Sequence, residues 1–202
     1  MDCRVQPLEP DCYYHIYNRG INGTNIFKND DNYSYFLRQF SKYVIEVADV
    51  FAYCLMPNHF HFLLKIKSED SLACFISKNI KRSSVSKEGL HAPQNITSKQ
   101  LSKFISSYTQ AFNKVNNRHG ALLESPFKRI KIDSEEYLKR LIVYIHQNPI
   151  DLDIDFRKFK YSSYQSILSN GKTNLMRDEA LAYFGGYENF IFSHNKVVDS
   201  NL

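Results

Sequence analysis

Two histidines separated by a single residue, His59 and His61, are the first side chains in this 202-residue sequence that could do chemistry. The apolar residues around them predict a β-strand, in which side chains two residues apart point to the same face of the sheet. Both imidazoles would then stand side by side on a strand anchored in the core, as a pair of metal ligands requires. His-x-His is a common pattern, however, and taken alone it fits at least as well two histidines that hydrogen-bond to the backbone or to water.

A tyrosine and an amide four residues apart, Tyr144 and Asn148, form the second candidate pair. They fall at the end of a predicted helix, where residues four apart share one face. The apolar stripe of this helix contains Leu138 and Ile145, so the phenol and the carboxamide would flank its buried face and could meet the sheet that carries the histidines. By itself, a tyrosine beside an apolar stripe is more typical of packing than of catalysis.

The composition favours an anionic partner without deciding for one. The chain has a net charge of +5 and contains 14 Tyr and 15 Phe but no Trp. Bases of single-stranded nucleic acid stack on aromatic rings while Lys and Arg follow the phosphates, which suits this mixture. Most of the rings are nevertheless expected to fill the core.

Membrane and disulfide-linked classes are disfavoured. No apolar stretch approaches the roughly 20 residues that a membrane span needs. The first residues also lack the apolar core of a signal peptide, so we expect residence in the cytoplasm. The cysteines show no Cys-x-x-Cys spacing and are expected to be reduced, small apolar residues: Cys3, Cys12, Cys54 and Cys74.

The elements that must position the candidate residues follow from the hydrophobic pattern. Strands are predicted over residues 13–20, 50–56, 59–67 and 127–132, the second and third forming a hairpin and the last presenting one basic face to water. Helices are predicted over residues 31–47, from 101 to about 115, and from 133 to the residue before Pro149. Residues 81–98 are predicted to form a loop, and residues from 193 onward to fray. This order of elements indicates an α+β sandwich with helices packed on an antiparallel or mixed sheet.

Four segments, taken together, resemble a known family. They are Met56-Pro57-Asn58-His59-Phe60-His61-Phe62-Leu63-Leu64, Ser125-Pro126-Phe127-Lys128-Arg129, Tyr144-Ile145-His146-Gln147-Asn148-Pro149 and Tyr161-Ser162-Ser163-Tyr164. In order and spacing they resemble the HUH single-tyrosine transposases, especially the REP-associated tyrosine transposases and related transposase-like proteins of bacteria. The likeness runs from about Tyr13 to Tyr164.

The resemblance implies a fold, a metal and a reaction. The fold would be a ferredoxin-like sandwich with a central antiparallel sheet, comprising a nuclease domain over residues 1–165 and a short C-terminal extension over residues 166–202. His59, His61 and Asn148 would bind Mg²⁺ or Mn²⁺, and Tyr144 would be the nucleophile. The protein would then be a single-stranded DNA endonuclease and strand transferase of the HUH type, acting on DNA transposition or recombination through a 5′-phosphotyrosine intermediate.

The partner would be single-stranded DNA, with or without a hairpin beside the cut. The protein would be associated with the nucleoid when it is bound to DNA. Whether the tyrosine acts within its own subunit or in a homodimer is open. The alternative is a domesticated protein on the same fold that binds nucleic acid without cutting it. A small-molecule metallohydrolase would need a general base such as Glu near His59, and the sequence shows none adjacent.

Tyr108 and Tyr137 are rival nucleophiles, but the residues four positions later are Phe112 and Leu141, which cannot bind a metal. Candidate contacts to DNA are polar and basic residues near the predicted strand and helix ends, although any one of them, taken singly, is more typical of a solvated surface charge. They are Asn18, Arg19, Lys114, Arg118, Lys128, Arg129 and Lys131.

Overall fold

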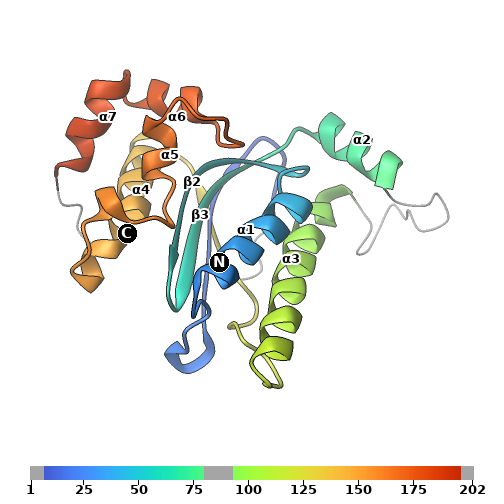
Figure 1. Ribbon diagram of the computed structural model, residues 1–202. Helices are drawn as coiled ribbons and strands as arrows, with labels where there is room; N and C mark the ends of the chain where they lie inside the picture. Colours follow the sequence, from blue (N-terminus) through green and yellow to red (C-terminus); the bar gives the residue numbers. More distant parts are fainter. Residues whose placement is uncertain (1–6, 80–92, 197–202) are drawn as a thin grey trace.

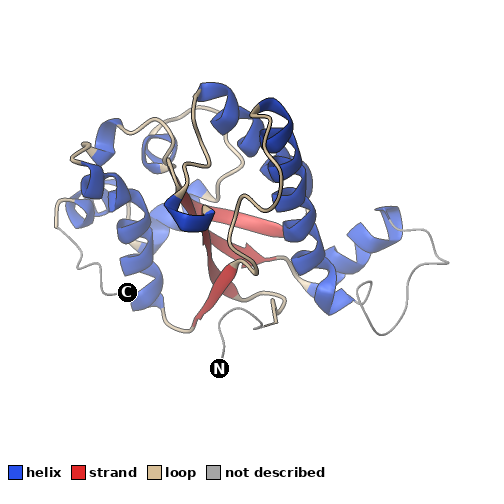
Figure 2. Cartoon of the chain, turned by 90° about the horizontal axis from the view of Figure 1, so that it is seen from below, coloured by secondary structure: helices blue, strands red, loops and turns tan. Residues whose placement is uncertain are grey.

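A four-stranded antiparallel sheet forms the centre of the protein (Figures 1 and 2). The structure is a computed structural model that describes residues 7–79 and 93–196. The strands lie in the spatial order β2 (Ala48–Met56), β3 (His59–Ile66), β1 (Tyr13–Arg19) and β4 (Lys128–Ile132). The predicted hairpin is therefore present, with β2 and β3 joined directly at Pro57 and Asn58.

Helices cover both faces of this sheet. One face packs against α1 (Asp30–Tyr43) and α3 (Pro93–Val115), with α2 (Glu69–Asn79) at the margin of the same core. The other face packs against α4 (Glu135–Gln147), which is followed by α5 (Tyr164–Leu168), α6 (Arg177–Tyr183) and α7 (Tyr187–His194). Figure 1 shows the two helical layers on opposite sides of the strands. Short 3₁₀ turns occur at Ile21–Gly23, Asn148–Leu152 and Phe156–Lys158.

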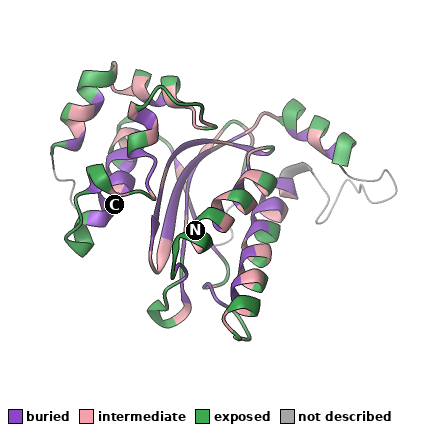
Figure 3. Cartoon of the chain, in the orientation of Figure 1, coloured by how far each residue is buried: buried purple, intermediate pink, exposed green. Residues whose placement is uncertain are grey.

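The alternation of side chains along the strands gives each face its own core. In β3, Phe60, Phe62 and Leu64 pack under α1 and α3, whereas Leu63 packs under α4. Figure 3 shows the result, with buried residues along the strands and on the inner faces of the helices. Because the period is two residues, His61 shares the α4 face with Leu63.

The strand order and connections confirm the ferredoxin-like prediction. From β1 to β4 the chain repeats strand-helix-strand twice, with α1 between β1 and β2, and with α2 and α3 between β3 and β4 on the same face as α1. In addition, α4 lies across the opposite face and brings its C-terminal end to the β2–β3 turn. The candidate side chains His59, His61 and Tyr144 lie on this second face.

The chain after α4 covers the outer edge of β2. The amide of Leu55 donates to the carbonyl of Tyr161 (2.9 Å), and the amide of Met176 donates to the carbonyl of Val50 (2.8 Å). These bonds occupy backbone groups that an uncovered edge strand would expose. The boundary at residue 165 stays a prediction, and side chains from α5 to α7 share the core of α4.

Several element boundaries differ from the sequence predictions. The helix predicted from 101 begins at Pro93, since proline is well suited to a first helical turn, so 93–98 is not a loop. Residues 81–92 of that predicted loop lie outside the described residues. The helix predicted to reach 47 ends at Tyr43. Fraying from 193 was also predicted wrongly, because α7 runs to His194 and buries it; residues 197–202 lie outside the described residues.

The prediction of one basic, water-facing side on β4 is wrong. Lys128 and Arg129 are adjacent, so the strand turns them to opposite faces. Arg129 keeps only 8% of its surface exposed. Among the described residues, no helix is both long enough and apolar enough to cross a membrane. Cys12, Cys54 and Cys74 are free thiols, and Cys3 lies outside the described residues.

Candidate active site

His59 and His61 lie at the start of β3, on the face of the sheet that α4 covers. The turn at Pro57 and Asn58 sets the start of the strand, and its apolar partners on both faces fix the register. His61 is buried, with 6% of its surface exposed, and His59 is half-buried. Both line a cleft of about 490 Å³, together with Tyr17, Asn18, Arg19, Gly23, Met56, Asn58, Glu124, Lys128, Asp151 and Leu152.

The end of α4 delivers Tyr144 and Asn148 to the same place. Buried Leu141 and Ile145 hold α4 on the sheet, and this orientation turns Tyr144 toward the histidines. The ring of Tyr144 meets the ring of His61 edge to face, with 5.6 Å between the centroids. Asn148 is buried, and its Oδ1 lies 3.3 Å from His59 Nε2. The structure thus brings together the four residues that the sequence singled out in two distant motifs.

The hydrogen bonds around His59 fix the positions of its protons. Nδ1 lies 2.7 Å from Asn58 Oδ1, which can only accept, so Nδ1 carries the hydrogen and Nε2 of the neutral ring carries a lone pair. The Nδ2 group of Asn148 donates to the carbonyl of Tyr144 (2.8 Å), so Oδ1 is the atom that faces His59. Two acceptors therefore point at each other.

Two lone pairs that face each other repel unless a proton or a cation lies between them. Burial lowers the pKa of His59, although Asn148 and Asp151 act in the opposite direction, and this disfavours the proton. Two imidazole nitrogens and an amide oxygen are instead a donor set that fits a divalent cation. Within the described parts of the chain, no three His, Cys, Asp or Glu side chains form a metal-binding group, and here the third donor is an amide.

A third histidine, His15 on β1, completes the site and was not singled out from the sequence. Its Nε2 lies 2.8 Å from His61 Nδ1, and only 5% of its surface is exposed. Burial lowers the pKa of His15 to about 3 and that of His61 well below its usual value. The signal in the sequence was a polar residue at a core position of a strand, between Tyr13 and Tyr17 on the same face.

The phenol of Tyr144 is held in its protonated form. Burial is the main cause of its raised pKa, and the negative charge of Asp151 adds to it, while the Asn148 amide acts in the opposite direction. The hydroxyl is therefore neutral at physiological pH, and a reaction at this oxygen must release the proton as the new bond forms.

Three of the seven predicted DNA contacts line the cleft. Arg19 is exposed and its Nε lies 2.7 Å from Glu124 Oε1, while Lys128 Nζ lies 4.0 Å from the other oxygen of that carboxylate. Asn18 is buried, and its Nδ2 donates to the backbone carbonyl of Glu124 (2.9 Å). Asn18 thus shapes the wall of the cleft, whereas Arg19 and Lys128 present charge to it.

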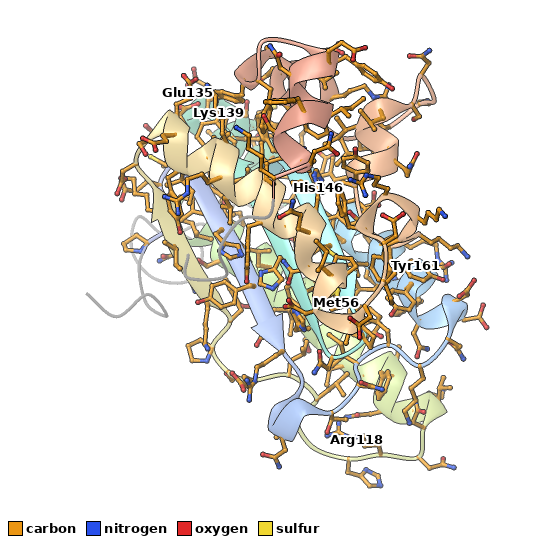
Figure 4. All side chains as sticks on the ribbon, turned by 90° about the vertical axis from the view of Figure 1, so that its left-hand side faces the viewer. Met56, Arg118, Glu135, Lys139, His146 and Tyr161 are labelled. Atoms are coloured by element: carbon orange, nitrogen blue, oxygen red, sulfur yellow. The ribbon has the colours of Figure 1, made fainter. Side chains whose placement is uncertain are left out.

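The other four predicted contacts lie elsewhere. Arg129 donates to Ser98 Oγ (3.0 Å) on the α3 face, and Lys131 pairs with a carboxylate oxygen of Glu9 (2.8 Å). Arg118 donates to the carbonyl of Ala121 (2.7 Å) within its own loop, and Figure 4 shows it well away from Met56 at the cleft. The exposed Lys114 lies at the end of α3.

A second pair of buried histidines lies near the site but faces away from it. His146 Nδ1 and His194 Nε2 are 2.8 Å apart, His194 Nδ1 donates to the carbonyl of Phe190 (2.7 Å), and His146 Nε2 lies 2.7 Å from Ser163 Oγ. All four ring nitrogens thus have protein partners. This pair joins α4 to α7, and Figure 4 shows His146 beside the C-terminal helices.

Comparison with known proteins gives a likeness at the level of structure. No protein family matches the sequence, and no curated protein matches it. Among solved structures, this chain is similar to the "REP associates tyrosine transposase bound to a REP hairpin", with a TM-score of 0.52 and 11% sequence identity. The match covers 82% of this chain and 84% of that one. At this identity the likeness shows that the two proteins share a fold.

Proposed function

We propose that this protein is a metal-dependent endonuclease and strand transferase for single-stranded DNA, with Tyr144 as its nucleophile. One observation carries the proposal. The lone pairs of His59 Nε2 and Asn148 Oδ1 converge at 3.3 Å, next to His61 and Tyr144 and beside a cleft that holds Arg19 and Lys128 as well as two carboxylates. The fold shared with a tyrosine transposase supports the same assignment.

His59, His61 and Asn148 would hold the ion. Imidazole nitrogens alone suit transition metals, whereas an amide oxygen completed by oxygens of water and phosphate suits Mg²⁺ or Mn²⁺, and we propose one of this pair. When bound, the ion supplies positive charge to a non-bridging phosphate oxygen and helps to orient the phosphorus for in-line attack. Arg19 and Lys128 would neutralise neighbouring phosphates.

Tyr144 would form the covalent bond. Its Oη joins the phosphorus while the bond from phosphorus to the 3′ oxygen breaks, and the proton lost by the phenol balances the one gained by the departing 3′ hydroxyl. The products are a 5′-phosphotyrosine and a free 3′ end. The phenol of tyrosine has a pKa of about 10, so its oxygen leaves far more readily than the oxygen of an aliphatic alcohol. Another 3′ hydroxyl can therefore attack the phosphotyrosine and reverse the step. Strand transfer then needs no nucleotide cofactor.

The substrate we propose is a single strand that folds into a hairpin beside the cut, the kind of partner named for the structural neighbour. The alternative is a domesticated protein that uses the same cleft only to bind nucleic acid. The two functions use the same cleft and differ in the fate of Tyr144: only the enzyme forms a covalent bond between this residue and DNA.

The test mixes the full chain with Mn²⁺ or Mg²⁺ and a pool of single strands labelled at their 3′ ends, and separates products on a denaturing gel. We expect a protein-linked label that requires the ion and disappears in Tyr144→Phe. Tyr137→Phe, on the same helix, is the matched control and should keep the adduct. No adduct from the wild type, or an undiminished one from Tyr144→Phe, would overturn the enzymatic proposal. Retarded DNA with strong salt dependence and no adduct would favour the binding protein.

A further inference from the structure

A buried histidine on a neighbouring strand supports one of the proposed metal ligands. We propose that His15 is a positioning residue: its Nε2 accepts the Nδ1 hydrogen of His61 and so holds that ring with its Nε2 lone pair available to the cleft. This inference rests on the proposed function, since it concerns the same site.

The 2.8 Å contact between His15 Nε2 and His61 Nδ1 allows two arrangements of protons. If His15 donates, the neutral His61 ring carries its hydrogen on Nε2 and cannot bind a cation there. If His61 donates, Nε2 keeps its lone pair. A ligand role for His61 therefore requires an acceptor at the position of His15 Nε2.

The sheet holds the two rings in this relation. β1 and β3 are hydrogen-bonded neighbours, with His15 opposite Leu63 and Tyr17 opposite His61. The His15 ring stacks on the Tyr17 ring, with 4.6 Å between the ring centroids. The centroids of the His15 and His61 rings are 5.0 Å apart, and the two ring planes differ by 23°. The His15 and Tyr144 rings are nearly perpendicular, with 6.4 Å between their centroids. Rigid strands and packed rings thus limit the orientations open to His61.

The two other proposed ligands receive comparable support from their surroundings. Asn58 accepts from His59 Nδ1, and the carbonyl of Tyr144 accepts from Asn148 Nδ2. In each case a protein acceptor takes the hydrogen on the far side and turns a lone pair toward the site. In the same way, His15 Nε2 would accept the Nδ1 hydrogen of His61 and leave the Nε2 lone pair of His61 free for the metal.

Substitutions at His15 can separate an acceptor role from simple packing. Gln and Met have similar length and volume, but Gln offers an amide oxygen to His61 Nδ1, whereas the Met thioether is a weak acceptor. We expect His15→Met to weaken Mn²⁺ binding by about 10- to 100-fold, and His15→Gln to stay within about 3-fold of the wild type. Calorimetric titration of the full chain with Mn²⁺ measures both.

The other histidine pair supplies the matched control. His194→Gln and His194→Met alter a buried contact of the same 2.8 Å length that faces away from the cleft. Both should change the thermal midpoint and leave Mn²⁺ affinity unchanged. If His15→Met binds Mn²⁺ as the wild type does, or His15→Gln fails as badly as His15→Met, the positioning role is overturned while the proposed function stands.

A measurement on the wild type covers the case in which His15→Met does not fold. Two-bond ¹H–¹⁵N correlation spectra of the imidazoles report which ring nitrogen carries the hydrogen. We expect His61 protonated on Nδ1, and His15 with Nε2 free of hydrogen. A hydrogen on His61 Nε2 in the presence of Mg²⁺, which is diamagnetic, overturns the inference, as does a wild type that binds no Mn²⁺ in the calorimetric titration. Normal Mn²⁺ binding without a DNA adduct would overturn the proposed function and leave the role of His15 intact.

Discussion

Two pairs of buried histidines, built from similar contacts, have opposite relations to the rest of the molecule. In the pair His146 and His194, protein groups meet every ring nitrogen, so the pair joins two helices. In the pair His15 and His61, the second ring lines a cleft beside His59. The direction of the unshared lone pair therefore separates the pair that joins two helices from the pair that we propose to serve the site. Burial and the length of the contact do not distinguish the two.

The same contrast holds for two neighbouring amides. Gln147 donates to the backbone carbonyls of His194 (3.0 Å) and Lys196 (2.7 Å), which fastens the C-terminal segment. Asn148, the next residue, turns its oxygen toward His59. The end of α4 thus places an anchoring amide directly before the amide that we propose as a metal ligand, and the predictions below test that difference.

The largest effect is expected at Asn148. Loss of a group that only supports a metal ligand lowers metal affinity by about 10- to 100-fold. Asn148→Ala removes one of the three proposed ligands itself, so Mn²⁺ affinity and adduct formation should fall by about 100-fold or more. Calorimetry and the gel assay measure the two quantities. Gln147→Ala should lower the thermal midpoint without a comparable loss of Mn²⁺ affinity, and equal effects of the two substitutions on affinity would break the contrast.

The next effect concerns stability. His194→Ala leaves the Nδ1 hydrogen of His146 without its acceptor in the interior and should lower the free energy of unfolding by about 2 kcal/mol. Urea denaturation followed by circular dichroism measures it. Mn²⁺ affinity should not change, and a variant as stable as the wild type would show that the closed pair does not hold α7 in place.

Acid should destabilise the closed pair in a defined window. Burial lowers the pKa of His194 to about 4 in the folded protein, whereas in the unfolded chain the pKa is about 6.5. Between these two pH values the unfolded chain binds a proton that the folded chain does not. Stability therefore falls as the pH drops through this window. From pH 7 to pH 5 the loss from this group should reach about 1 to 2 kcal/mol.

His194→Gln removes that titrating group and should flatten the fall. Urea denaturation of wild type and variant at several pH values between 7 and 5 gives the comparison. Parallel pH curves for the two proteins would show that His194 keeps an ordinary pKa in the folded state.

The smallest effect is expected for charges on the two faces of β4. Lys128→Ala should weaken binding of single-stranded DNA about 3-fold and reduce the salt dependence by roughly the contribution of one phosphate contact. Lys131→Ala removes a charge of the same strand that is paired with Glu9 outside the cleft, and binding should stay near the wild-type level. Fluorescence anisotropy at several salt concentrations measures both, and equal losses would contradict the assignment of the cleft.

Short-range rules predicted much of the fold and part of the site. The two-residue period of a strand and the four-residue spacing of a helix bring His59 to His61 and Tyr144 to Asn148. The hydrophobic pattern also located the four strands, because each has apolar partners on a buried face. The meeting of the two motifs at 3.3 Å followed from the resemblance to a fold, since spacing alone says nothing about distant segments.

Contacts between distant segments were beyond such rules. His15 meets His61 because β1 pairs with β3 in one particular register, and the sequence does not show which strands are neighbours. His194 belongs to a chain end that was expected to fray, and only its packing against α4 reveals its partner. The charge of Arg129 predicts a surface position, but Arg129 follows Lys128 directly in a strand and therefore points to the opposite face of the sheet.

The most direct test of the account is the identity of the residue that carries the DNA. Wild-type protein is allowed to react with an unlabelled strand and Mn²⁺, trimmed with nuclease, digested with trypsin and analysed by mass spectrometry. Cleavage after Arg140 and Arg157 releases a peptide, residues 141–157, in which Tyr144 is the one tyrosine. We predict that this peptide carries the nucleotide. A nucleotide on any other peptide, or an unmodified Tyr144 in a protein that binds Mn²⁺ and DNA, would contradict the account.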